Sequence, residues 1–219
     1  MLGPGVRWVG AQRDVLGGDL RGHVALESLA AAPNLYGLGP LEGLRGEVSI
    51  VGSALSIARM ERGAVVTSAS WKERACFLVW AQVETWSEQA SPSGLADLDE
   101  LEQRLVTLAR EAGLDPERPF PFRVHGTAAQ ATFHVLDKRD GLPHSPQRHE
   151  YAKVRRTLED APVELVGFYS TRHRGIFTPR ESNLHVHLCT EDGRTSGHLE
   201  EIRLEARAQL AVPATGWAQ

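Results

Sequence analysis

Residues 183–190 of the chain have the sequence NLHVHLCT, and residues 191–198 follow as EDGRTSGH. The first stretch alternates between apolar and other residues, and alternate side chains of a strand share one face. His185 and His187 therefore point to the same side of a predicted strand. The Asp-Gly pair at 192–193 is typical of a two-residue turn between antiparallel strands, with left-handed backbone at both turn positions. We therefore expect a β-hairpin here.

The predicted turn sets a register that brings a third histidine to this pair. With the bend at 192–193, His187 pairs with His198, and directly paired residues lie on one face, about 4.5 to 5.5 Å apart. Three imidazoles with an open coordination position are typical of a catalytic zinc site. Iron, manganese, nickel and copper also accept imidazole, so the pattern leaves the metal open. Cys189 and Glu200 share the face by parity, but we do not expect them to be ligands.

A plainer interpretation places these three histidines on the solvent face of an edge hairpin. It is less favoured because the strand that carries the pair is otherwise apolar. Among the remaining histidines, two lie in predicted strands and could be polar residues near the site, His125 and His134. Four lie in predicted loops, where we expect surface exposure: His23, His144, His149 and His173.

Strands dominate the rest of the chain. They are predicted over residues 46–60, 64–67, 75–85, 120–125 and 131–136, and from residue 163 onward. Helices are expected over residues 24–32 and 95–112, and residues 151–160 are interpreted as a third helix. The second of these has leucines at helical spacing, which indicates a core-facing stripe. Because helices do not alternate with strands, the pattern predicts an α+β fold with a largely antiparallel sheet or open barrel.

Composition restricts the classes of partner. The formal net charge of −4 comes with scattered Lys and Arg, which argues against a nucleic-acid or membrane-surface binder. The two cysteines, Cys76 and Cys189, are expected to be reduced thiols. Residues 1–7 lack the charged start and apolar run of a secretory signal, and no stretch is long enough to span a membrane. We therefore expect a cytoplasmic protein.

Three blocks of the sequence resemble the α-acetolactate decarboxylase family, over roughly residues 18–204. The C-terminal block is GFYS at 167–170, then HVHL at 185–188 and Gly-His at 197–198. The N-terminal block is GLGPLEGLRGE at 37–47. The third block, FHVLDKR at 133–139, is similar to the run that the family's catalytic arginine closes.

The resemblance implies a role for individual residues. His185, His187 and His198 would bind the metal and orient a substrate with adjacent hydroxyl and keto groups. Glu47 matches the glutamate that serves the metal centre, as a ligand or as the acid that reprotonates the enolate. Arg139 matches the arginine that meets the substrate carboxylate or the developing enolate. The alternative for Glu47 is an exposed carboxylate at a turn. The alternative for Arg139 is a solvated arginine in a loop.

The resemblance also implies an architecture. A mixed or antiparallel sheet would pack against a smaller antiparallel barrel-like sheet, with few helices and the metal site between the sheets. We expect residues 1–219 to form a single unit, with an N-terminal part over 18–115 and a C-terminal strand-rich part over 116–212. A homodimer is also implied.

The chain departs from the family pattern at a few positions. Pro40-Leu41 stands in place of Thr-Phe, and Ser196-Gly197 replaces a doubled glycine. The sequence ends at Gln219, and no residue matches the glutamate that the family's C-terminal segment brings to the site. Glu201 or Glu205 could take its place. The chain thus resembles a divergent member with a shortened C-terminus.

The function predicted from these patterns is metal-dependent decarboxylation of a small branched 2-hydroxy-3-keto acid, such as 2-acetolactate, to acetoin. Zinc is the expected cofactor. One alternative is a cupin-like metal oxygenase or isomerase, because those barrels also combine His-x-His with a later histidine and a nearby glutamate, here Glu191. A second alternative is a non-catalytic module that binds a metal or small ligand, derived from the decarboxylase fold.

Overall fold

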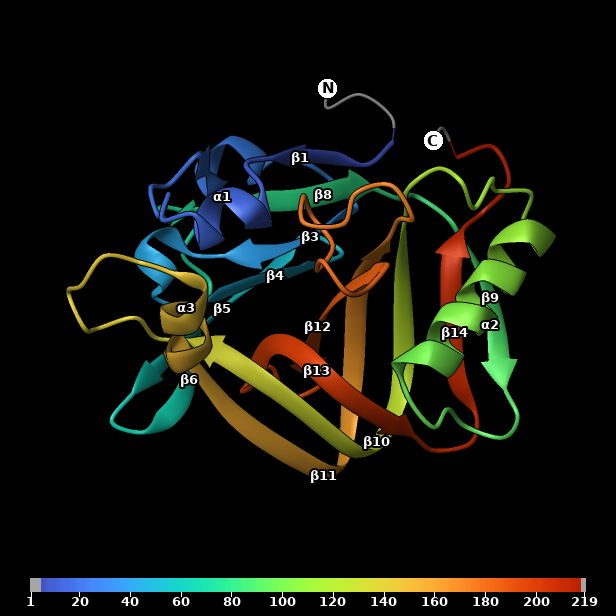
Figure 1. Cartoon of the computed structure of the whole chain (residues 1–219). Coiled ribbons are helices and arrows are strands. Elements are labelled where there is room, and N and C mark those ends of the chain that lie inside the picture. Colours follow the sequence, from blue (N-terminus) through green and yellow to red (C-terminus); the bar gives the residue numbers. More distant parts are fainter. Residues whose placement is uncertain (1–4, 218–219) are drawn as a thin grey trace.

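Two six-stranded sheets make up most of the chain in a computed structural model that describes residues 5–217 (Figure 1). Every pairing between neighbouring strands is antiparallel. The first sheet contains, in spatial order, β1 (Arg7–Val9), β8 (Leu78–Gln82), β3 (Leu35–Pro40), β4 (Glu47–Val51), β5 (Ala54–Glu61) and β6 (Ala64–Ser68). The second contains β11 (Lys153–Tyr169), β12 (Leu184–Thr190), β13 (Ser196–Leu204), β10 (Phe120–Leu136), β14 (Ala208–Pro213) and β9 (Trp86–Ser91).

The second sheet partly closes on itself. The two longest strands, β10 and β11, pair with each other along most of their length, and β12 and β13 connect their other edges. Irregular register between β10 and β13 at Ala128/Gln130 and at Thr132/Phe133 accompanies the sharp bend of β10 in Figure 1, because a bulge bends and twists its strand. The expected α+β fold with a barrel-like second sheet is therefore confirmed.

The helices are few. They are α1 (Gln12–Leu16), α2 (Leu98–Glu111) and α3 (Pro146–Ala152), with short 3-10 turns η1 (Leu26–Leu29) and η2 (Glu42–Leu44). The α2 helix confirms the main helix prediction. The Asp97 side chain caps it by accepting a hydrogen bond from the Glu100 backbone N–H. Leu101, Leu105 and Leu108 are buried along one side of it, so the leucine stripe faces the core.

Three local predictions were wrong in detail. Residues 46–60 form a hairpin, β4–β5, because Gly52 and Ser53 both adopt positive φ and turn the chain. Residues 24–32 hold the two-residue strand β2 (Val24–Ala25), paired with β7 (Arg74–Ala75), and one 3-10 turn instead of a helix. Residues 153–160 belong to β11, not to a helix. Their pairing with β10 outweighs local helix preference.

The hairpin register predicted from the sequence is confirmed. His187 pairs with His198, Leu188 with Gly197 and Cys189 with Ser196. The turn itself is wider than expected. The Thr190 N–H donates to the Thr195 carbonyl, so four residues, 191–194, form the connection. Within it Gly193 has positive φ, whereas Asp192 does not.

The two sheets pack face to face around the hairpin. Hydroxyl contacts link them directly: Ser49 Oγ of β4 lies 3.0 Å from His187 Nδ1, and Ser56 Oγ of β5 lies 2.8 Å from Ser196 Oγ. The opposite side of the hairpin, with Val186 and Leu188, packs into the core beneath α2. Both faces of β12 are thus buried. Among residues 5–217 no helix is long and apolar enough to cross a membrane.

The sheets do not follow the sequence division at residues 115 and 116. The β9 strand lies within the predicted N-terminal part but pairs with β14 in the second sheet. The α2 helix likewise packs against β14. The C-terminal strand thereby holds the middle of the chain in the second sheet.

Candidate metal centre

Three imidazoles converge between the sheets. His185 and His187 come from β12 and His198 comes from β13, and their ring centroids lie 4.8 to 5.4 Å apart. Each ring offers one nitrogen to the group, and these nitrogens all lie within 4.8 Å of one another. His185 and His187 are fully buried, and His198 is partly exposed. The hairpin therefore places the three predicted ligands together.

Neighbouring groups fix which nitrogen of each ring faces the centre. His185 Nδ1 donates to the Phe177 carbonyl oxygen at 2.7 Å, which leaves the Nε2 lone pair free because a carbonyl only accepts. His187 Nδ1 lies against Ser49 Oγ, and its Nε2 is buried without a hydrogen-bond partner among the described residues. Such contacts to the remote nitrogen are how proteins orient metal-binding histidines.

The spacing of the inward-facing nitrogens is compatible with a metal ion, although two of them lie within hydrogen-bond distance of each other. His185 Nε2 and His198 Nδ1 are 3.1 Å apart. Two nitrogens on one tetrahedral zinc ion, each bonded at about 2.0 to 2.1 Å, are about 3.3 Å apart. The Nε2 of His187 completes the group, because a buried imidazole nitrogen without a partner is costly, and a cation that meets it would remove that cost. The donor set therefore fits a divalent ion.

Burial keeps these rings neutral. It lowers the pKa of His185 to about 3, although the bond to the Phe177 carbonyl opposes this shift. It also lowers the pKa values of His187 and His198 well below their ordinary value. Neutral imidazole is the form that binds metal, so the ligands need not lose a proton before binding near pH 7.

Glu47 of β4 faces the same centre. Its side chain is 1% exposed, and its carboxyl oxygens lie 3.8 Å from His187 Nε2 and 3.9 Å from His134 Nε2. Its Oε1 has no hydrogen-bond partner within the described part of the chain. Burial raises the pKa of Glu47 to about 8. The structure thus brings Glu47 to the histidines, as the sequence resemblance implied.

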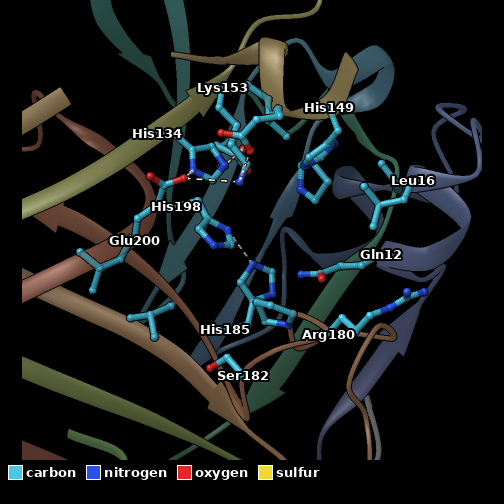
Figure 2. Close-up of a pocket in the computed structure, with 18 of the residues that line it drawn as sticks. Gln12, Leu16, His134, His149, Lys153, Arg180, Ser182, His185, His198 and Glu200 are labelled. Atoms are coloured by element: carbon cyan, nitrogen blue, oxygen red, sulfur yellow. Dashed lines mark hydrogen bonds and ion pairs between the residues drawn. The ribbon is translucent and has the colours of Figure 1, made fainter. Parts of the chain in front are cut away.

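A cavity opens beside the imidazoles (Figure 2). Its volume of about 460 Å³ is within the range of small-molecule sites. His185, His198 and Glu47 line it, whereas His187 is buried behind them. Its apolar lining includes Phe77 and Leu184. A small ligand in this cavity would meet the exposed side of the candidate metal centre.

His134 of β10 also lies at the centre. The sequence analysis had left open whether this residue is close to the site. It pairs directly with His198, and the two rings stack at 4.6 Å between centroids. Its Nδ1 lies 2.9 Å from a carboxylate oxygen of Glu200, whose other oxygen accepts from Arg155 at 2.6 Å. Burial alone would raise the pKa of Glu200, but these two bonds outweigh it and lower the pKa to about 2. The ionised Glu200 therefore orients His134.

His149 was expected on the surface, and the structure corrects this. It lies on α3 and lines the cavity. Burial lowers its pKa to about 4, and its Nδ1 has no hydrogen-bond partner among the described residues. No local pattern pointed to His149, because residues 140–150 around it have the polar composition of a loop.

Arg139 is not brought to the histidines. Its side chain is 57% exposed, its Nε donates to Asp137 at 2.8 Å, and its Nη2 donates to the Met60 carbonyl. It does not line the cavity. The β10 strand ends at Leu136, so strand parity no longer controls where the following residues point. The guanidinium is held instead on the surface beside β5.

Other acidic and thiol candidates also lie outside the ligand group. Glu191, the position that a cupin-like site would use, is half exposed at the hairpin turn, 3.4 Å from His125 Nε2. Glu201 and Glu205 are exposed. Cys189 is a free cysteine and does not join the three histidines.

Fold and site together define an α+β protein with a candidate three-histidine metal centre at the edge of a small-molecule cavity. The family model for α-acetolactate decarboxylase matches residues 11–216. The chain therefore belongs to the α-acetolactate decarboxylase family, a family of carboxy-lyases. This confirms the resemblance drawn from the three sequence blocks.

Solved structures show the same fold. A Staphylococcus aureus protein of unknown function, similar to α-acetolactate decarboxylase, superposes with a TM-score of 0.78 at 14% identity, covering 96% of this chain and 86% of that one. The α-acetolactate decarboxylase of Bacillus subtilis strain 168 gives 0.76 at 14% identity with the same coverage. The acetolactate decarboxylase of Bacillus subtilis subspecies spizizenii gives 0.77 at 15%, covering 95% and 85%. No curated protein sequence matches the chain.

Proposed function

We propose that this protein catalyses metal-dependent decarboxylation of a small branched 2-hydroxy-3-keto acid, with 2-acetolactate, which gives acetoin, as the leading candidate. The family membership supports a decarboxylase. The observation that supports metal dependence is the convergence of three neutral imidazoles beside a cavity. Zinc is the favoured ion because it accepts three nitrogen ligands and a substrate in the fourth position.

The ligands would be His185, His187 and His198. Loss of carbon dioxide from a β-keto acid leaves an enolate, and a divalent ion bound here would supply Lewis-acid stabilisation of its oxygen. The chain's own residues do the rest. The contacts of His185 with Phe177 and of His187 with Ser49 hold the ligands in place.

Glu47 is the carboxyl group placed to deliver a proton to the product carbon. It lies at the cavity beside His187, with one oxygen free of hydrogen bonds from the described residues. A general acid must reach the atom that it protonates, and the position of Glu47 beside the imidazoles supports this role for a substrate held there. Glu200 also lines the cavity but is bound by His134 and Arg155.

The direct test is to incubate the purified protein with racemic acetolactate and to measure carbon dioxide and acetoin. The protein should be assayed after chelation and again after reloading with zinc, manganese or iron. We expect turnover that chelation abolishes and one of these metals restores. Absence of turnover with every metal would reject the proposal in favour of a non-catalytic module. Oxygen consumption with the iron form would favour the oxygenase alternative.

A further inference from the structure

Two cationic side chains line the cavity among the described residues, and they differ in their electrostatic environment. Lys153 Nζ lies 3.1 Å from a Glu150 oxygen and 3.5 Å from a Glu200 oxygen, so carboxylates already compensate its charge. Arg180 also lines the cavity, and none of the residues 5–217 forms a hydrogen bond or ion pair with its guanidinium. Arg180 is therefore the cationic lining residue whose charge is uncompensated by the described residues, and in Figure 2 its guanidinium is directed away from His185 toward the outer side of the cavity.

Gln12 supplies a second free polar group on the same side. Its side-chain amide has no hydrogen-bond partner in the described part of the chain, and it points into the cavity toward His185 (Figure 2). Figure 2 shows Gln12 and Arg180 on one side of the cavity, across from His134 and Glu200. A polar group left unpaired on a cavity wall is available to a ligand.

Backbone contacts link the segment that carries Arg180 to the candidate metal centre. Arg180 belongs to the connection between β11 and β12, and the same connection supplies the Phe177 carbonyl that orients His185. The Ile176 carbonyl of this connection accepts from the Gln12 backbone N–H at 2.8 Å. The position of Arg180 relative to the imidazoles is therefore set by ordered backbone, while its exposed side chain remains free to turn onto a ligand.

We propose that Arg180, assisted by the Gln12 amide, binds the carboxylate of the substrate, in place of the Arg139 that the sequence pattern selects. This rests on the proposed function for the identity of the substrate. A guanidinium fork matches a carboxylate with two parallel hydrogen bonds. The hydroxy-keto end of the same molecule would then face the imidazoles, and the carboxylate would lie on the opposite, cationic side of the cavity.

Equilibrium binding tests this without requiring turnover. One ligand is the dihydroxy acid made by reducing the keto group of acetolactate, which cannot lose carbon dioxide through an enolate. The other is the matching neutral diol. Titration calorimetry on the metal-loaded protein should show that R180A weakens binding of the acid about 10- to 100-fold, the range of a lost charged hydrogen-bonding pair, and leaves binding of the diol unchanged.

Two further variants serve as controls. R180K keeps the charge but loses the fork, and we expect it to bind the acid with intermediate affinity. R139A should bind both ligands as the wild type does. Acid binding unchanged in R180A, a loss confined to the acid in R139A, or a wild type that does not prefer the acid to the diol would each overturn the assignment.

Steady-state kinetics separates this inference from the proposed function. The carboxylate leaves as neutral carbon dioxide, so Arg180 binds the ground state at least as strongly as the transition state. R180A should therefore raise KM about 10- to 100-fold and change kcat by less than about threefold. A protein that binds the acid through Arg180 yet releases no carbon dioxide would refute the proposed function and leave the role of Arg180 standing.

Discussion

The histidine hairpin and the segment at residues 133–139 were both selected by the same sequence resemblance, and the structure treats them differently. The hairpin brings His185, His187 and His198 together in the predicted register. The other segment leaves β10 after Leu136 and carries Arg139 to the surface. The hairpin residues lie inside paired strands, where each neighbour fixes the facing direction of the next. Arg139 follows the end of a strand, where only the path of the loop decides its direction.

This difference teaches which functional residues a pattern can place. Parity and a short turn together determine three positions from one another, because backbone hydrogen bonds lock the register. An arginine that follows the last backbone hydrogen bond of a strand has no such constraint. The Arg139 guanidinium donates to nearby acceptors, Asp137 and the Met60 carbonyl. Four variants can break this contrast or sharpen it: one in the hairpin, one in the facing strand β4 and two in the segment at residues 133–139.

His187→Ala should have the largest effect. It removes one of the three proposed ligands, so zinc affinity should fall by more than about 100-fold, beyond the loss typical of residues that only support a ligand. Decarboxylation should fall to background at stoichiometric metal. Metal analysis after dialysis and the carbon dioxide assay check this. His125→Ala, on the exposed part of the second sheet, is the control, and stoichiometric metal in His187→Ala would reject the ligand assignment.

Glu47→Gln should have the next largest effect. The substitution keeps the shape of the side chain and removes its proton, so kcat should fall about 100-fold or more, as for other general acids. Folding should be retained, because Gln is neutral in a buried position. Glu42→Gln lies five residues away on an exposed turn and should retain at least half of the activity. Equal kcat values for Glu47→Gln and the wild type would remove Glu47 from the mechanism.

His134→Ala should have an intermediate effect on the metal rather than on chemistry. The stacked His134 ring confines His198, and losing a residue that supports a ligand costs about 10- to 100-fold in metal affinity. Competition with a chelator measures this. His134→Phe retains a ring and should lose less than His134→Ala, which separates stacking from the bond to Glu200. Equal zinc affinity in all three proteins would show that His198 needs no such support.

Arg139→Ala should have the smallest effect. Its ion pair with Asp137 is exposed, and such pairs contribute about 0 to 1 kcal/mol. We expect a kcat/KM within about twofold of the wild type and a fall in Tm of no more than about 4 °C. Kinetics and thermal unfolding of the same preparation check both. A fall in kcat/KM above tenfold would mean that Arg139 reaches the substrate and that the contrast with the hairpin is false.

The fold shows the same division between local and distant constraints. The α2 helix was predicted because its leucine spacing is a local signal, and the structure adds a local cap at Asp97. The strand at residues 153–160 was missed because it has no clear alternation of its own and becomes a strand by pairing with β10. The membership of β9 in the second sheet was equally hidden, because its partner β14 lies more than a hundred residues further along the chain.

The sequence alone determined the three histidines and their register, since an alternating strand and a short turn fix side-chain direction through neighbouring hydrogen bonds. With the family motif it also identified Glu47. Only the tertiary structure decided that Glu47 and His134 meet these rings, that His149 and Arg180 line the cavity and that Arg139 does not. Those placements depend on how two sheets pack and where loops run, and contacts between residues distant in sequence decide both.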